Sequence, residues 1–229
     1  MKRIEGENGS FLPEEIIPTL ESEVTPERLQ RIDKVVQGRR QDLAVVLENI
    51  YNRGNTHAVM RTMEAFGYFQ LHSIQLQEDY KLSIGRVSQG ADKWLLERPW
   101  QTTENCVESL KKDGYQILVT SLEGGIPIYD ADFSRPTALC FGNERDGASK
   151  ALLENCDQRV YIPMHGFVQS FNISVAAALC LQHIRRSHDT LSSSGLSPEW
   201  QKYLKALYLL RGCTNGEPLV LENRRRNPS

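Results

Sequence analysis

Strand-length apolar runs alternate with amphipathic stretches through the central part of the chain. The apolar runs lie at residues 43–50, 71–77, 115–122, 136–143 and 159–164. Apolar positions spaced three or four apart predict helices at residues 55–67, 103–114, 148–156 and 174–186. Asn55 is the expected N-cap of the first of these helices, and Gly67 its expected end. Strands that alternate with helices predict an α/β fold, in which helices cover both faces of a parallel sheet.

The two ends of the chain follow other patterns. Residues 1–24 carry scattered glutamates and two prolines without a sustained period, so we expect a mobile acidic arm. A helix is predicted at residues 25–38, with Thr25 as its N-cap and Pro26 at its first position. We therefore place the central domain at residues 25–188, and expect a linker, one helix and a disordered basic tail over residues 189–229.

The predicted C-terminal helix at residues 199–212 is strongly apolar, with Trp200, Tyr203, Leu204, Leu207 and Leu210. A helix of this composition must bury one face. The surface that covers it belongs either to its own domain or to a partner subunit.

Composition and charge narrow the function classes. With 40% hydrophobic and 24% charged residues, the 229-residue chain is typical of soluble globular proteins, and its longest apolar run, at residues 175–181, is too short to cross a bilayer. The start of the chain lacks an apolar signal core. The five cysteines have no C-x-x-C spacing, which favours a reducing cytoplasm without structural zinc.

A net charge of −2 argues against a generic nucleic-acid binder, but the charge is unevenly distributed. Residues 28–40 hold five cations: Arg28, Arg31, Lys34, Arg39 and Arg40. On charge alone, this cluster is either the solvated face of a helix or a surface that binds phosphates.

Candidate chemistry follows the predicted strands, because ligands of a parallel sheet bind at the carboxyl ends of its strands. The first strand is followed by Asn55 and Arg61, and later strands by GNERDG and HGFVQSFN. Glycines flank Glu144 and permit a tight turn. Capping of the next helix explains part of the last motif, but not Ser170. The dinucleotide, phosphate-loop and H-E-x-x-H zinc motifs are all absent.

Three segments carry a resemblance to a known family. NTHAVMRTMEAFG (55–67), GNERDGAS (142–149) and IPMHGFVQSFNISVAAAL (162–179) resemble, in this order and spacing, the three motifs of the SPOUT-class RNA 2'-O-ribose methyltransferases. Similarity is greatest to the TrmH type, which methylates guanosine 18 of tRNA. The resemblance covers residues 25–188. It implies a C-terminal trefoil knot, S-adenosylmethionine as cofactor, tRNA as substrate, a cytoplasmic homodimer, and no metal or membrane.

Matching positions assign roles to single residues. The resemblance gives catalysis to Arg61, Asn55, Glu144, Ser170 and Asn172. It gives cofactor binding to Thr120, Gly142, Ile162, Met164 and Phe171. It gives RNA binding to Arg28, Arg31, Arg39 and Arg186. Since an arginine holds its proton at neutral pH, we expect Arg61 to bind a phosphate, orient the hydroxyl and stabilise negative charge, rather than to act as a base.

Two alternatives stay open at this point. The enzyme could act on ribosomal RNA or on another tRNA nucleotide, although the short segment before the domain favours tRNA. A knotted RNA-binding protein without catalysis is the other, and the intact set of five catalytic positions argues against it.

Overall fold

The computed structural model describes residues 3–75, 90–190 and 195–226, which form two compact units. The larger unit comprises residues 40–193, and the smaller comprises residues 1–39 together with 194–229. These boundaries differ from the expected ones at 25 and 188. Helix α2 (Pro26–Gly38) packs against α7 (Pro198–Gly212), so it belongs to the smaller unit and not to the sheet. Residues 76–77 of one predicted strand, and 191–194 of the predicted linker, lie outside the described residues.

The larger unit is built on a parallel sheet, as predicted. Its strands are β3 (Arg40–Glu48), β4 (Tyr68–Ile74), β5 (Leu96–Trp100), β6 (Gln116–Thr120), β7 (Ile126–Pro127), β8 (Thr137–Phe141) and β9 (Gln158–Tyr161). In the described part of the chain they pair in the order β5-β4-β3-β8-β6-β9-β7. All residues of β4 and β8 are buried, which is why β8 reads as a nearly continuous apolar run, whereas β4 also buries three polar side chains, Gln70, His72 and Ser73.

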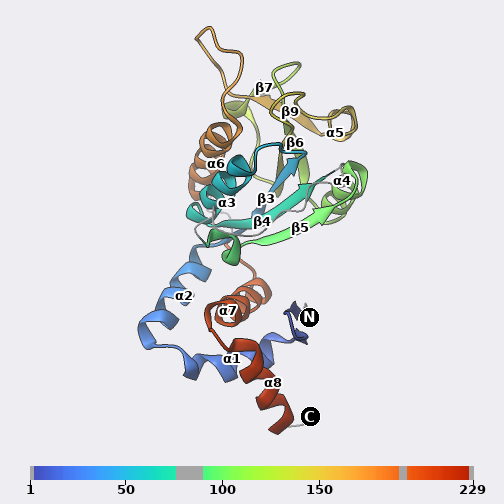
Figure 1. Ribbon diagram of the computed structural model, residues 1–229. Helices are drawn as coiled ribbons and strands as arrows, with labels where there is room; N and C mark the ends of the chain where they lie inside the picture. The colour runs from blue at the N-terminus through green and yellow to red at the C-terminus, as the bar shows by residue number, and fades with distance from the viewer. Residues whose placement is uncertain (1–2, 76–89, 191–194, 227–229) are drawn as a thin grey trace. The chain divides into compact units, whose positions relative to one another are not determined.

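Two layers of helices cover the sheet (Figure 1). On one face, α4 (Thr103–Lys112) and α5 (Lys150–Asn155) pack together, and their Cys106 and Leu152 form one core with Val46 and Val119. Side chains alternate across a strand, so the intervening residues of β3 and β6 point to the other face. There α3 (Arg53–Ala65) packs against α6 (Ile173–Thr190). The short helices η2 (Ala91–Trp94) and η3 (Ile128–Asp130) lie in connections between strands.

Strands β3 and β8 meet at a point where the chain changes direction. They are neighbours in the sheet, but β3 leads into α3 on one face and β8 leads into α5 on the other. Connections that leave in opposite directions open a crevice at the carboxyl ends of the two strands, and ligands of open α/β sheets bind in such crevices.

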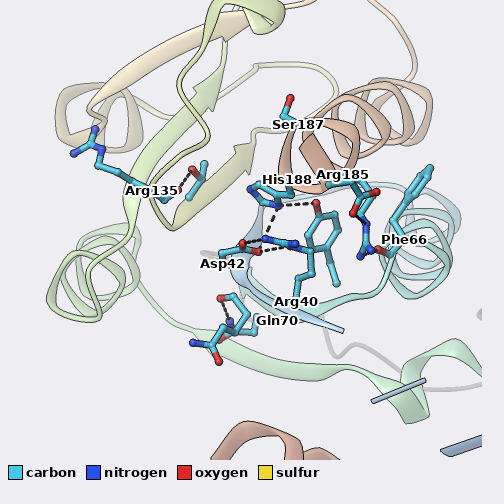
Figure 2. Close-up of polar contacts among 12 residues, drawn as sticks. Arg40, Asp42, Phe66, Gln70, Arg135, Arg185, Ser187 and His188 are labelled. Atoms are coloured by element: carbon cyan, nitrogen blue, oxygen red, sulfur yellow. Dashed lines mark hydrogen bonds and ion pairs between the residues drawn. The ribbon is translucent and has the colours of Figure 1, made fainter. Parts of the chain in front are cut away.

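A buried polar cluster lies at the amino ends of β3 and β4, opposite the carboxyl ends where the crevice opens (Figure 2). The Nδ1 atom of His188, near the end of α6, lies 3.1 Å from the hydroxyl of Tyr68 and 3.4 Å from Oδ1 of Asp42. Arg40 donates from Nε to the same Asp42 oxygen at 3.1 Å. Burial lowers the pKa of His188, although Asp42 acts in the opposite direction. The cluster fastens the end of α6 to the starts of β3 and β4.

The smaller unit is mainly helical. It contains β1 (Ile4–Glu5), β2 (Ser10–Phe11), α1 (Pro13–Leu20), η1 (Glu21–Glu23), α2, α7 and α8 (Gly216–Arg226). Thr25 caps α2 by accepting a hydrogen bond from the N–H of Arg28 at 3.3 Å, which confirms the predicted start. Leu204, Leu207 and Leu210 of α7 are buried, and Trp200 and Tyr203 are partly buried. Because α7 packs against α1, α2 and α8 of this unit, this burial needs no partner subunit.

The expectation of a mobile arm was wrong, and so was that of a disordered tail as far as Arg226, where α8 ends; residues 227–229 lie outside the described residues. Ile16 and Leu20 of α1 are fully buried, because α1 packs on α7 and α8. The glutamates of the arm pair with cations of the C-terminal helices. Glu14 pairs with Lys202, Glu21 with Lys205 at 2.7 Å, and Glu15 with Arg224 at 2.7 Å. Each of the two segments supplies the charge that the other lacks.

Candidate active site

A pocket of about 720 Å³ opens at the carboxyl ends of the strands in the larger unit. Its walls come from the segments that follow β6, β8 and β9, and from the start of α6. The residues predicted for cofactor binding all line it: Thr120, Gly142, Ile162, Met164 and Phe171. Positions up to 51 residues apart in sequence are therefore brought to one cavity, as the resemblance implied.

The turn that follows β8 forms one wall of the pocket. The N–H of Asn143 donates to the carbonyl of Gly147 at 2.8 Å, and the N–H of Gly147 donates back at 2.9 Å. A side chain at Gly142 would place its Cβ 2.2 Å from the backbone nitrogen of Ala148, so only glycine fits there. Gly147 has a positive φ of 72°. The two glycines of the GNERDG motif thus close a tight turn that presents Glu144.

Glu144 accepts three hydrogen bonds from the segment that follows β3. The donors are the N–H of Tyr51 at 2.8 Å, the N–H of Asn52 at 3.2 Å and Nδ2 of Asn55 at 2.9 Å. Partial burial acts to raise the pKa of Glu144, but these hydrogen bonds outweigh it and the pKa lies below its ordinary value. The side chain is therefore ionised at neutral pH.

Asn172 connects the loop before α6 to the same cluster. Its Nδ2 donates to Oδ1 of Asn55 at 3.2 Å, while its own Oδ1 accepts from the N–H of Ser174 at 2.9 Å and from the Ser174 hydroxyl at 2.6 Å. Helix capping and site formation are thus functions of one side chain. Glu144, Asn172 and the exposed Ser170 all line the pocket.

The start of α3 differs from the prediction. Asn52 is the N-cap, with its Oδ1 accepting from the N–H of Gly54 at 2.8 Å, and the helix begins at Arg53. Because Asn52 takes the capping role, the amide of Asn55 is available to Glu144 and Asn172. Sequence reasoning missed the two backbone donors at Tyr51 and Asn52. The signal for the earlier start of α3 was the asparagine at position 52, because it is as good an N-cap residue as Asn55.

Arg61 lies on α3 but outside this cluster. Six residues along a helix correspond to a rise of about 9 Å and a rotation of about 240° from Asn55. The Arg61 side chain is exposed and forms no hydrogen bond or ion pair with the described residues. It does not line the pocket, so the structure of one chain brings together four of the five predicted catalytic residues.

The residues predicted to bind RNA fall into three situations. Arg28 and Arg31 are exposed on α2 of the smaller unit. Arg186 is exposed on α6 of the larger unit. Arg39 differs from the expectation, because its side chain is 1% exposed and its guanidinium lies 5.5 Å from the centre of the Tyr208 ring. A side chain buried in this way cannot reach a phosphate, so the structure does not support RNA binding by Arg39.

The described residues contain neither a membrane-spanning helix nor a group of side chains suited to a metal ion. No helix within residues 3–75, 90–190 and 195–226 is both long and apolar enough to cross a membrane. Over the same ranges, no three His, Cys, Asp or Glu side chains are grouped so that they could hold a metal ion.

Comparison with known proteins identifies the family. The sequence model of the SpoU rRNA Methylase family matches residues 42–182 of this chain. The tRNA (guanosine(18)-2'-O)-methyltransferase of Thermus thermophilus is 34% identical over 72% of this chain and 84% of its own length. The crystal structure of the TrmH/SpoU tRNA modifying enzyme of Aquifex aeolicus superimposes with a TM-score of 0.71, at 32% identity, over 80% of this chain and 95% of that one.

A second similar structure contains a ligand. The SpoU methyltransferase AviRb of Streptomyces viridochromogenes, in complex with the cofactor AdoMet, has a TM-score of 0.59 and 27% identity, over 69% of this chain and 62% of that one. The family match includes every residue of the Asn172–Asn55–Glu144 cluster and of the pocket turn at 142–149. The chain belongs to the SpoU rRNA methylase family.

Proposed function

We propose that this protein transfers a methyl group from S-adenosylmethionine to the ribose 2'-hydroxyl of guanosine 18 in tRNA. The observation that carries the proposal is the hydrogen-bonded chain of Asn172, Asn55 and Glu144 at the rim of the pocket. It joins the three motifs by which the sequence resembles tRNA ribose methyltransferases. The relatives named for this reaction match most of the chain, 72% of it in one case and 80% in another.

The pocket suits S-adenosylmethionine. Its volume of about 720 Å³ lies in the usual range for small-molecule sites, about 300–1,000 Å³. The absent side chain at Gly142 lets the turn pack closely on its own backbone at Ala148, and Ile162, Met164 and Phe171 add an apolar wall. These residues, with Thr120, would hold the cofactor. When bound, it supplies a methyl group on a positively charged sulfur, which needs no metal to be electrophilic.

The residues of the chain then position the RNA. The new bond forms between the 2'-oxygen and the methyl carbon as the carbon–sulfur bond breaks, and the proton of the hydroxyl passes to solvent water. Glu144 is a weak proton acceptor, because its pKa is lowered and its oxygens already accept three hydrogen bonds. Its role is to fix Asn55. Arg61 binds the neighbouring phosphate, orients the hydroxyl and stabilises the negative charge that develops on oxygen.

The segment from Ile162 to Asn172 belongs to a C-terminal trefoil knot in this proposal. Support comes from the likeness in fold to the Aquifex aeolicus enzyme and from the bends that Pro163 and Gly166 allow before α6. A knotted segment cannot relax by simple displacement, which suits a loop whose backbone must grip a cofactor.

The active enzyme is a homodimer in which Arg61 serves the pocket of the partner. Val175 and Leu179 lie one turn apart on α6 and are 45% and 42% exposed, and Phe171, two residues before the start of α6, is 39% exposed. Exposed apolar side chains one turn apart on a helix favour association with another copy. The separation of Arg61 from Asn55 on α3 also favours this arrangement, because one chain alone lacks the arginine at its pocket.

The experiment is methylation of defined RNAs with labelled S-adenosylmethionine, followed by mapping of the modified nucleotide. Unmodified tRNA transcripts, the same transcripts with guanosine 18 replaced by adenosine, and ribosomal RNA fragments serve as substrates. We expect one 2'-O-methyl group per tRNA at guanosine 18 and none in the replaced transcript. Methylation of ribosomal RNA or of another tRNA nucleotide would contradict the substrate assignment, and no incorporation into any RNA would contradict the activity.

A further inference from the structure

Glu48, the last residue of β3, is a buried carboxylate with no role in the mechanism above. Its side chain is 1% exposed and does not line the pocket. It accepts three hydrogen bonds: from the Thr103 hydroxyl at 2.5 Å, from the N–H of Ser149 at 2.8 Å and from the Ser149 hydroxyl at 2.8 Å. A buried carboxylate is expensive unless it is paired in this way, so its presence calls for a function.

The partners of Glu48 lie where two elements begin. Thr103 is the first residue of α4 and does not line the pocket. Ser149 is the N-cap of α5, and its hydroxyl oxygen also accepts from the N–H of Leu152 at 3.1 Å. Ser149 directly follows Ala148, a pocket-lining residue and the one that crowds Gly142. Glu48 therefore holds the far end of the 142–149 turn.

The residue after Glu48 holds the near end of the same turn. Asn49 has a positive φ of 52°, and its carbonyl accepts from Nδ2 of Asn143 at 2.6 Å. Oδ1 of Asn143 in turn accepts from the N–H of Arg145 at 2.8 Å and from that of Asp146 at 3.2 Å. Glu48 at the end of β3 and Asn49 directly after it thus hold both ends of the turn that forms one pocket wall and carries Glu144.

We propose that Glu48 is a positioning residue for cofactor binding: by holding Ser149 it keeps the 142–149 turn in the conformation that forms the wall of the pocket. The inference rests on the proposed cofactor site. Backbone atoms within the turn approach closely at Gly142 and Ala148, and such packing persists only where the ends of a turn are fixed. Without the carboxylate, the turn relaxes toward solvent and binding must then supply the free energy to order it.

The experiment measures S-adenosylmethionine binding to the full-length protein by titration calorimetry, without RNA. Glu48→Met keeps the length of the side chain and removes all three hydrogen bonds. Glu48→Gln keeps most of them, since its oxygen accepts the Ser149 N–H while its amide donates to the two hydroxyls, which rotate to accept. We expect Glu48→Met to raise the dissociation constant about tenfold or more, equivalent to about 1.4 kcal/mol, and Glu48→Gln to raise it less than about threefold.

A matched variant separates positioning from general stability. Gln116, at the start of β6, is 8% exposed and also makes three side-chain hydrogen bonds, at 2.6 Å to the Asp132 carbonyl, 2.8 Å to Thr137 and 2.6 Å from Arg135. It lies at the amino end of β6, whereas the pocket lies at the carboxyl end of that strand. Gln116→Met should lower the urea midpoint about as much as Glu48→Met and leave the dissociation constant unchanged. Equal weakening of binding by both variants would overturn the proposal.

A second pair of variants applies even where Glu48→Met fails to fold. Ser149→Ala and Thr103→Val each remove one hydroxyl from the same carboxylate, but only Ser149 belongs to the turn. We expect Ser149→Ala to weaken binding about threefold or more and Thr103→Val to leave it unchanged. If the wild type binds S-adenosylmethionine but the Ser149→Ala and Thr103→Val variants have equal dissociation constants, the positioning role of Glu48 is overturned while the proposed function stands. A wild type that does not bind S-adenosylmethionine would overturn the proposed function, and this inference with it.

Discussion

Asn55 and Glu144 are joined by a hydrogen bond of 2.9 Å between Nδ2 and Oε1, across 89 residues of sequence. Asn55 follows β3 and Glu144 follows β8, so the bond spans the crevice between two strands whose connections leave to opposite faces of the sheet. The Asn55 amide is oriented at both ends, because its oxygen accepts from Asn172 while its nitrogen donates to Glu144. A side chain held in this way can serve as a fixed hydrogen-bonding group beside the substrate.

Replacing Glu144 by glutamine tests this arrangement. The glutamine amide would turn an N–H group toward donors, so Asn55 would lose its fixed orientation. We expect kcat for methyl transfer to fall about 10- to 100-fold, the effect of about 1–3 kcal/mol for one unsatisfied donor, with a smaller change in cofactor affinity. Steady-state kinetics and calorimetry measure the two effects. Glu154→Gln, on the exposed side of α5 and paired with Lys150 at 3.5 Å, is the control and should retain full activity. Unchanged turnover by Glu144→Gln would contradict the role given to the cluster.

The sequence predicted the central strands of the sheet because these strands are buried on both faces, whereas the partly exposed β5 and the two-residue β7 were not predicted. The run at 136–143 could be recognised without any partner, and β8 occupies residues Thr137–Phe141. The terminal helices could not be predicted in this way. The burial of Ile16 in α1 depends on α7, far along the chain, and local composition gave no sign of that contact.

For the site as well, some features could be predicted from the sequence and others could not. Glycines and polar residues after β8 and β9 marked the pocket, because tight turns need particular residue types. Arg39 was misjudged, since a cluster of cations in sequence does not reveal that one of them lies over the ring of Tyr208. The N-cap at Asn52 was missed because two asparagines compete for it, and only the position of Glu144 decides between them.

The exposed arginines of α2 give a prediction about salt. Replacing Arg28 and Arg31 together by glutamine should weaken tRNA binding and reduce the slope of log K against log salt by about one to two units, because each lost phosphate contact accounts for somewhat under one. Binding measured between about 50 and 200 mM salt gives the slope. Lys111 and Lys112, exposed at the end of α4, supply the control, and their double replacement should leave the slope unchanged. An identical slope for the Arg28 and Arg31 variant would show that α2 does not contact phosphates.

His72 gives a prediction about pH. Its side chain is 2% exposed, and Nδ1 accepts from Nε1 of Trp100 at 3.0 Å. Burial, and to a smaller extent Arg98, lowers the pKa of His72 to about 4. Between about pH 6.5 and about pH 4, His72 is therefore protonated in the unfolded chain and neutral in the folded chain. Because the unfolded state binds the additional proton, the folded state loses stability as the pH falls through this range. His72→Gln keeps an acceptor for Trp100 but does not titrate.

Urea unfolding at pH 7.5 and at pH 4.5 measures the effect. Between these values the wild type should lose about 2–3 kcal/mol more unfolding free energy than His72→Gln, at about 1.4 kcal/mol per pH unit below the unfolded pKa. Carboxylates that titrate in the same range contribute equally to both proteins and cancel in the difference. Equal losses would show that His72 is not held in its neutral form by the fold.

The composite site gives the sharpest prediction. In a dimer where Arg61 serves the partner's pocket, Arg61→Ala and Asn172→Ala place their lesions in different sites. Each variant alone should have lost about 100-fold or more of its activity while binding the cofactor through its remaining pocket residues. After subunit exchange of equal amounts, about half of the dimers are mixed, and each mixed dimer holds one intact site of two. Activity should therefore return to about a quarter of the wild-type value.

A second mixture provides the matched control. Glu144 and Asn172 both belong to the pocket of their own chain, so a mixed dimer of Glu144→Ala and Asn172→Ala carries one lesion in each site and should stay inactive. Exchange is verified by differently tagged subunits, and light scattering gives the mass of the assembly. Recovery in the first mixture and none in the second can arise only if Arg61 acts across the dimer. A monomer, or no recovery in the first mixture after verified exchange, would mean that Arg61 reaches the pocket of its own chain or has no part in catalysis.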